Sequence, residues 1–110
     1  MQDLNIRKDR KAGRITFTRT HALNALTHDM VLAIEAALDA WREDDSVSLV
    51  IIDAEGDRAF CAGGDVAQVY HNAKAGDHSS GQVFFADEYR MNAKIWNYEK
   101  PIVAFMHGFV

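Results

Sequence analysis

The 110-residue chain has only one cysteine, Cys61, and one proline, Pro101. One cysteine cannot form an internal disulfide framework, which excludes a disulfide-stapled scaffold and suits a reducing compartment. No apolar run approaches the roughly 20 residues that span a bilayer. The net charge of −4 comes without a basic stripe, which argues against nucleic acid as the main partner. We therefore expect a cytoplasmic protein that binds neither membrane nor nucleic acid.

Hydrophobic periodicity predicts alternating strands and helices in a single α/β domain over residues 1–110. The expected strands cover residues 6–10, 14–19, 47–52 and the apolar segment after Lys100-Pro101. The expected helices cover residues 28–44, 66–70 and 82–98, with a flexible polar loop at 72–81. The last strand lacks a covering element, so we expect the domain to be incomplete at its C-terminus.

The first long helix is predicted from an N-cap and an apolar stripe. Thr27 can cap its first turn. The apolar positions recur at helical spacing and comprise Met30, Val31, Ile34, Leu38 and Trp41. Glu35, Asp39 and Arg42 fall on the other face.

The stretch Phe60-Cys61-Ala62-Gly63-Gly64-Asp65 is the strongest candidate for chemistry. It follows a predicted buried strand, and its glycines leave backbone N–H groups uncovered by side chains. Such groups at the start of a helix can stabilise negative charge that develops on oxygen. The alternative is an ordinary strand–turn–helix connection, in which Asp65 caps the following helix.

Glu88 is the second candidate, because it interrupts the predicted apolar stripe Phe84, Met91 and Ile95. A carboxylate in such a stripe is costly to ionise unless it is paired, which would suit it to proton transfer near neutral pH. The alternative is a structural carboxylate paired with a Lys or Arg. Asp87 lies at the edge of the stripe and is the weaker candidate.

The chain shows no metal-ligand motif. The five histidines have no paired spacing of the H-x-x-x-H kind, so we expect no metal. Cys61, between Phe60 and Ala62, is expected to be a packed side chain rather than a nucleophile.

Four segments, in order and spacing, resemble the N-terminal half of the crotonase (enoyl-CoA hydratase/isomerase) superfamily. They are Ile15-Thr16-Phe17-Thr18-Arg19, Ala22-Leu23-Asn24-Ala25-Leu26, residues 58–66 around the paired glycines, and Lys100-Pro101-Ile102-Val103-Ala104. The doubled glycine before Asp65, and Glu88-Tyr89 within residues 84–92, are most similar to the 3-hydroxyisobutyryl-CoA hydrolase branch.

The resemblance implies a crotonase-like ββα superhelix, a CoA thioester substrate and a homo-oligomer. It implies that the Gly64 N–H is one oxyanion donor and that Glu88 contacts substrate. The implied CoA-binding residues are Ala22, Leu23, Asn24, Ala62, Gly63, Gly64 and Asp65. The second oxyanion donor and further acidic residues of the family would lie beyond Val110. No separate cofactor is implied, because CoA is part of the substrate.

The function we expect is hydrolysis of an acyl-CoA thioester, as in the 3-hydroxyisobutyryl-CoA hydrolysis of valine catabolism, with weak activity from these 110 residues alone. An enoyl-CoA hydratase or isomerase is the alternative within the superfamily. A non-catalytic acyl-CoA-binding or assembly module is the alternative from another class.

Overall fold

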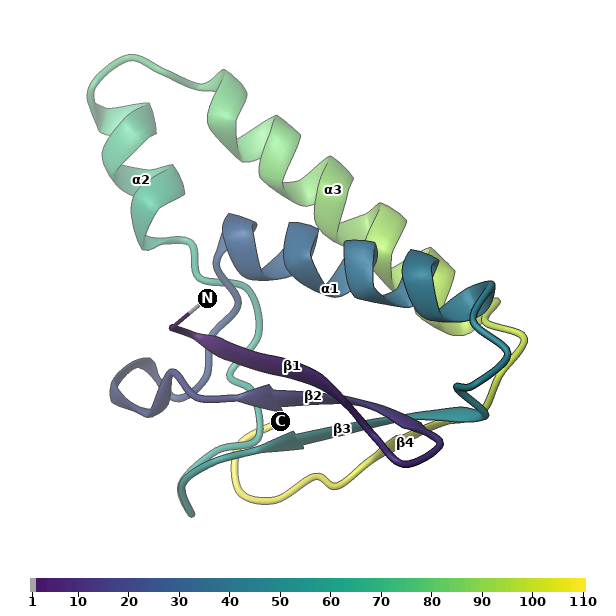
Figure 1. Cartoon of the computed structure of the whole chain (residues 1–110). Helices are drawn as coiled ribbons and strands as arrows, with labels where there is room; N and C mark the ends of the chain where they lie inside the picture. The colour runs from purple at the N-terminus through teal and green to yellow at the C-terminus, as the bar shows by residue number, and fades with distance from the viewer. Residues whose placement is uncertain (1) are drawn as a thin grey trace.

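The computed structural model describes residues 2–110 as a four-stranded sheet with helices on one side (Figure 1). The strands are β1 (Leu4–Asp9), β2 (Ala12–Phe17), β3 (Leu49–Ala54) and β4 (Ile102–Ala104), and the sheet order is β1-β2-β3-β4. The helices are the 3-10 turn η1 (Thr20–Ala22), α1 (His28–Arg42), α2 (Ala67–Lys74) and α3 (Ser79–Trp96). The predicted α/β class is confirmed.

The sheet begins as a hairpin and continues as parallel strands. β1 pairs with β2 antiparallel, while β2 with β3 and β3 with β4 pair in parallel. The carboxyl ends of β2, β3 and β4 therefore meet at one edge of the sheet. The segments that follow these three strands hold the candidate site, as is usual for open α/β sheets.

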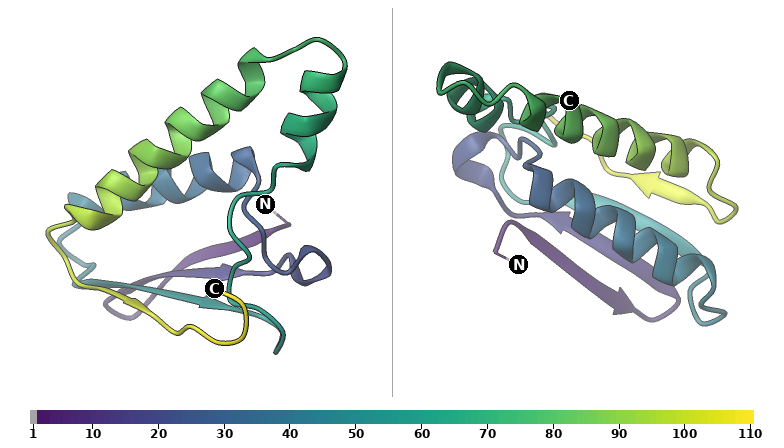
Figure 2. Two further views of the ribbon diagram at one scale, coloured as in Figure 1. Left: turned by 180° about the vertical axis from the view of Figure 1, so that it is seen from behind. Right: turned by 90° about the horizontal axis from the view of Figure 1, so that it is seen from above.

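α1 lies across one face of the sheet, and α3 runs along α1 (Figures 1 and 2). The Thr27 hydroxyl accepts the Met30 N–H at 3.2 Å, which confirms the predicted N-cap. The predicted apolar stripe of α1 is buried against the sheet. The N-terminal end of α3 rises away from the sheet together with α2.

One sequence-based expectation about the helices was wrong. The predicted loop at 72–81 is mostly helical, because α2 continues to Lys74 and α3 begins at Ser79. The Asp77 carboxylate accepts the Ser79 N–H at 3.1 Å, so polar residues taken for a loop support a helix start. Glu35, on the face of α1 opposite the predicted apolar stripe, is only 8% exposed because α3 covers that side of α1.

Candidate functional site

Three segments meet at the carboxyl edge of the sheet and hold one another by backbone hydrogen bonds. The Ala62 N–H donates to the Leu23 carbonyl at 3.0 Å, joining the segment after β3 to the segment after β2. The Phe60 N–H donates to the Phe109 carbonyl at 2.9 Å, joining it to the segment after β4. The turn at residues 60–65 is thus fixed from both sides.

Gly64 lies in this turn with its own peptide groups directed away from the neighbouring segment. Leu26 donates to the Gly63 carbonyl at 2.8 Å and accepts the Asp65 N–H at 2.7 Å. Because the peptide between Gly63 and Gly64 is trans, the Gly64 N–H points opposite to that carbonyl, away from Leu26. The Gly64 N–H donates to no acceptor among residues 2–110.

Both glycines of the turn have a physical reason to be glycine. Gly63 has φ +97°, a backbone conformation that side chains rarely adopt. A Cβ on Gly64 would lie 3.0 Å from Glu88 Oε2 and 3.2 Å from Phe84 Cε1. The backbone of Gly64 is therefore within close reach of the Glu88 carboxylate from α3.

Glu88 is half-buried, less buried than its place in the apolar stripe predicts. Phe84 and Met91 of the same stripe are buried, whereas Glu88 lies at its margin, where α3 passes the turn. Its carboxylate forms no ion pair or hydrogen bond with any of residues 2–110. The alternative of a carboxylate paired with Lys or Arg therefore does not apply to Glu88 within the described chain.

Two other carboxylates, those of Glu35 and Asp87, pair with basic side chains instead. Glu35 accepts two hydrogen bonds from Arg90, at 2.7 and 2.9 Å. Asp87 lies 2.5 Å from His28 Nε2 and 2.8 Å from Arg90. The hydrogen bond from His28 and the pairing with Arg90 lower the pKa of Asp87. Neither the pairing of Glu35 nor that of Asp87 with His28 was found from the sequence, because no local pattern specifies a partner on another helix.

The segment at Ala22, Leu23 and Asn24 lies beside the turn but does not present all of its side chains. Leu23 and Asn24 both have positive φ, at 54° and 55°. The Asn24 side chain is 1% exposed and donates to the carbonyls of Glu55 and Ala59. Asn24 therefore holds the loop together through its side-chain N–H groups, while its buried Oδ1 has no hydrogen-bond partner among the described residues. A contact of the Asn24 backbone with CoA stays a prediction. A contact of Ala22 or Leu23 with CoA stays a prediction.

Asp65 also makes structural contacts. Its carboxylate accepts the Ala67 N–H at 3.0 Å and pairs with Arg19 at 2.7 Å. The backbone hydrogen bond from Ala67, and then Arg19, lower the pKa of Asp65. Asp65 thus supports the start of α2 and fixes the end of the turn, although the N-cap residue is Val66 rather than Asp65. A contact of Asp65 with CoA stays a prediction.

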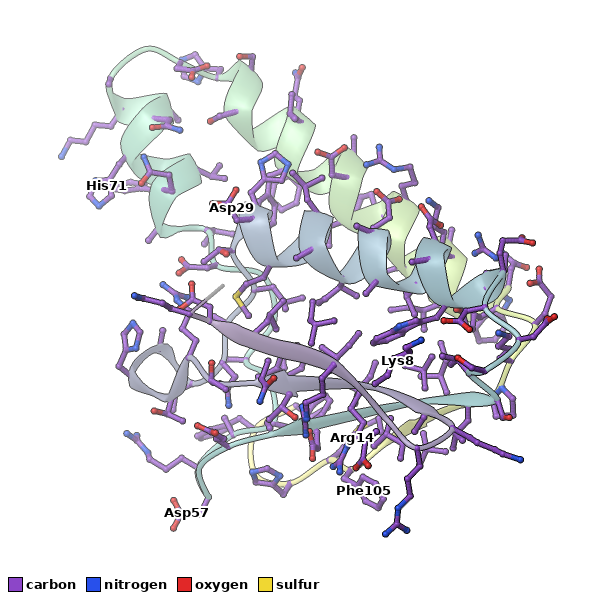
Figure 3. All side chains as sticks on the ribbon, viewed as in Figure 1. Lys8, Arg14, Asp29, Asp57, His71 and Phe105 are labelled. Carbon is purple, nitrogen blue, oxygen red and sulfur yellow. The ribbon has the colours of Figure 1, made fainter. Side chains whose placement is uncertain are left out.

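A cleft of about 470 Å³ adjoins the turn between α1, α2 and α3. Asp65 and Phe84, the neighbours of Gly64 in sequence and in space, line it. Asp29 and His71, labelled in Figure 3, contribute from the start of α1 and from α2. Charged and polar side chains therefore line this cleft together with the apolar surface of Val69 and Phe84.

Within residues 2–110, no group of three His, Cys, Asp or Glu side chains is arranged to hold a metal ion. No helix in that same stretch has the length and apolar character needed to cross a membrane.

Residues 12–110 match the family model described as enoyl-CoA hydratase/isomerase. The chain belongs to this family. The predicted superfamily is thereby confirmed, and solved structures agree. A crystal structure of an enoyl-CoA hydratase from Rhodobacter sphaeroides is 57% identical, with a TM-score of 0.94 over 96% of this chain and 32% of that one. A carnitinyl-CoA dehydratase from Mycobacterium thermoresistibile is 44% identical, with a TM-score of 0.94 over 100% and 32%. These matches confirm the crotonase-like fold.

Curated relatives of this enoyl-CoA hydratase/isomerase family member are named 3-hydroxyisobutyryl-CoA hydrolase. The zebrafish (Danio rerio) protein is 47% identical over 98 residues, which are 89% of this chain and 25% of the relative. The human protein is 37% identical over 107 residues, 97% of this chain and 28% of the relative. The chain thus spans about a quarter of these relatives. Both relatives have the word mitochondrial in their names, which differs from the cytoplasmic location expected for this chain from its composition. That location stays a prediction.

Proposed function

We propose that these residues form part of an acyl-CoA thioester hydrolase of the 3-hydroxyisobutyryl-CoA type. The observation that carries the proposal is the pairing of two groups without partners in residues 2–110. The Gly64 N–H has no acceptor, and the Glu88 carboxylate beside it has no cation or donor. The N–H can stabilise an oxyanion, and the nearby carboxylate can accept a proton from the attacking water, so both groups can act in one hydrolytic step.

In the proposed step the thioester carbonyl oxygen accepts the Gly64 N–H. Glu88 takes a proton from a water molecule whose oxygen attacks the carbonyl carbon. The oxyanion that forms is stabilised by the N–H, and its collapse breaks the C–S bond. The proton passes to the departing thiolate, so the products are a free acid and CoA.

Glu88 suits the base because it lacks an ion-pair partner in the described chain. A carboxylate held by Arg or Lys, as Glu35 is, gives up proton affinity to its partner. Glu88 has no such partner among residues 2–110 and stands half-buried next to the turn. CoA would lie along the backbone of Ala62 and Gly63 and beside Ala22 and Leu23.

The resemblance to the family assigns the second oxyanion donor to residues beyond Val110. One donor is worth about two to three orders of magnitude in rate. We therefore expect the 110-residue chain alone to hydrolyse thioesters weakly. Release of free CoA measures this, and turnover by the 110 residues as fast as that of the intact zebrafish relative would contradict it.

The activity test uses a chimera in which residues 12–110 replace the matching segment of the zebrafish relative. Glu88→Gln is expected to lower kcat more than it weakens CoA binding, while Glu99→Gln, an exposed glutamate beyond α3, serves as the control. Gly64→Pro, which removes the N–H, is expected to lower kcat as well. Unchanged kcat in Glu88→Gln would reduce Glu88 to a structural residue.

Enoyl-CoA hydration or isomerisation is the second candidate. It is favoured by the 57% identity to the Rhodobacter sphaeroides structure, which is named an enoyl-CoA hydratase. Product analysis with crotonyl-CoA and with 3-hydroxyisobutyryl-CoA separates the two reactions. Binding of CoA by calorimetry without turnover of either substrate would favour an acyl-CoA-binding module. Sedimentation at two concentrations tests the expected homo-oligomer.

A further inference from the structure

A series of contacts through the start of α1 connects the turn at Gly64 with Glu88 on α3. Leu26 bonds the residues on both sides of Gly64, at 2.8 and 2.7 Å. Two positions later, His28 Nε2 lies 2.5 Å from Asp87 Oδ2. Asp87 immediately precedes Glu88, and Glu88 Oε2 lies 3.0 Å from the place of a Cβ on Gly64. His28 therefore connects the segment that bonds to the turn with the residue that precedes Glu88.

His28 makes a second contact that leads to the same turn. Its ring packs edge-on against Phe84, with centroids 5.7 Å apart and planes at 63°. The Phe84 ring in turn lies 3.2 Å from the place of a Cβ on Gly64. One side chain from α1 therefore touches both the residue before Glu88 and the ring that covers Gly64.

The His28 contacts reach the first half of α3, which holds Phe84 and Asp87. α3 follows α2 after residues 75–78 and rises away from the sheet at its N-terminal end (Figure 1). The other ion pairs between α1 and α3, made by Arg90 and Lys94, lie on its second half. Among the described residues, His28 makes the polar contact from α1 closest in sequence to Glu88.

We propose that His28 is a positioning residue, which sets the distance between the Glu88 carboxylate and the Gly64 N–H through its hydrogen bond to Asp87 and its packing on Phe84. The inference rests on the proposed function for its catalytic consequence. The position of Glu88 itself can be measured without turnover. The competing explanation is that the His28–Asp87 bond adds stability to the helix pair and nothing more.

The ionisation of the Cys61 thiol can report the position of the Glu88 carboxylate. It is the only cysteine of the chain and is partly buried beside the turn. Burial raises the pKa of the Cys61 thiol, and the charge of the nearby Glu88 carboxylate raises it further. The pH dependence of Cys61 alkylation, normalised to its alkaline plateau, therefore reports the proximity of Glu88 independently of access to the thiol.

The experiment compares variants of the 110-residue chain. Glu88→Gln should lower the apparent pKa of Cys61 and sets the scale of the effect. His28→Leu should shift it in the same direction and should add nothing in the Glu88→Gln background. His28→Gln, whose side-chain N–H can still donate to Asp87 but which lacks the ring that packs on Phe84, should return the value part of the way to that of the wild type.

Lys94→Met is the matched control. Lys94 pairs with Glu35 and Asp39 across the same two helices, but six positions beyond Glu88 in sequence. A general loosening of α3 would appear in this variant as well as in His28→Leu. We expect Lys94→Met to lower the unfolding temperature and to leave the Cys61 titration unchanged.

Two results would overturn the inference. One is an unchanged Cys61 titration in His28→Leu when Glu88→Gln moves it; the other is no movement in Glu88→Gln itself. If His28→Leu does not fold by circular dichroism, Asp87→Ala breaks the same bond from the other side and is judged by the same criteria. Absence of thioester turnover in the chimera would refute the proposed function while leaving the Cys61 result intact, so the two failures are distinguishable.

Discussion

Replacing Glu35 with Gln tests how firmly α1 and α3 are held together. Glu35 is 8% exposed, and its two carboxylate oxygens accept hydrogen bonds from Arg90 at 2.7 and 2.9 Å. Lys94 Nζ lies 3.0 Å from the same carboxylate. The change to Gln keeps the shape of the side chain and removes its charge.

The size of the effect follows from the environment of Glu35. The hydrogen bonds from Arg90, with a smaller contribution from Lys94, lower its pKa from 4.5 to about 2, although burial opposes the change. A difference of about 2.5 pKa units corresponds to about 3 kcal/mol of unfolding free energy. Because the Arg90 side chain is 49% exposed, solvent screening reduces this, and we expect about 1–2 kcal/mol.

The sign of the pH dependence is fixed by the lowered pKa. Glu35 binds a proton less readily in the folded chain than in the unfolded chain, so acid favours unfolding. The stabilisation is complete above pH 4.5 and is lost as the pH falls toward 2. The difference between wild type and Glu35→Gln should therefore shrink over this range.

Urea unfolding at a series of pH values measures the difference directly. Glu43→Gln, which removes the charge of an exposed glutamate at the end of α1, is the control and should change little. Two results would refute the reasoning. One is an equal unfolding free energy of wild type and Glu35→Gln at neutral pH; the other is a difference between them that does not decrease in acid. The first result would mean that the desolvation of Glu35 cancels its ion pairs.

Three further substitutions test the packing around the site. Gly13→Ala would place a Cβ 2.5 Å from Trp41 Cδ2 and 2.7 Å from Cζ3, so we expect a loss of about 1–3 kcal/mol by urea unfolding, and much less in a Trp41→Leu background. Asn24→Ala leaves two backbone carbonyls without their donor and should lower the unfolding free energy by about 1–3 kcal/mol; wild-type stability would show that water replaces the amide. Gly63→Ala forces a side chain into φ +97° and should cost about 1–2 kcal/mol in thermal unfolding, whereas an unchanged midpoint would mean that the turn relaxes.

The elements that the sequence predicted correctly are those with local signals. The alternation around Ile15 and Phe17 marks β2, and Thr27 with the apolar stripe behind it marks α1. The paired glycines at 63–64 were placed correctly in a turn after a buried strand. These signals lie within one element or at its boundary, so no tertiary contact is needed to recognise them.

The sequence is uninformative where a second layer changes what a residue contacts. Glu35 looks like a surface residue of an amphipathic helix, yet α3 covers it and supplies Arg90. Asn24 belongs to the loop predicted to lie along CoA, and the sequence does not reveal that its side-chain amide donates to two carbonyls inside the protein. In both cases a polar side chain bonds to a partner far away in sequence, which no local pattern encodes.

The sequence by itself determined the order of strands and helices, the family, and Gly64 and Glu88 as candidate residues. Only the tertiary structure decided which of the neighbouring carboxylates is free. Asp87 and Glu35 are bound by groups on facing helices, whereas Glu88 stands beside the Gly64 turn with no partner in residues 2–110. The physical reason is that pairing depends on which helix faces which side chain, and that is set by packing rather than by spacing along the chain.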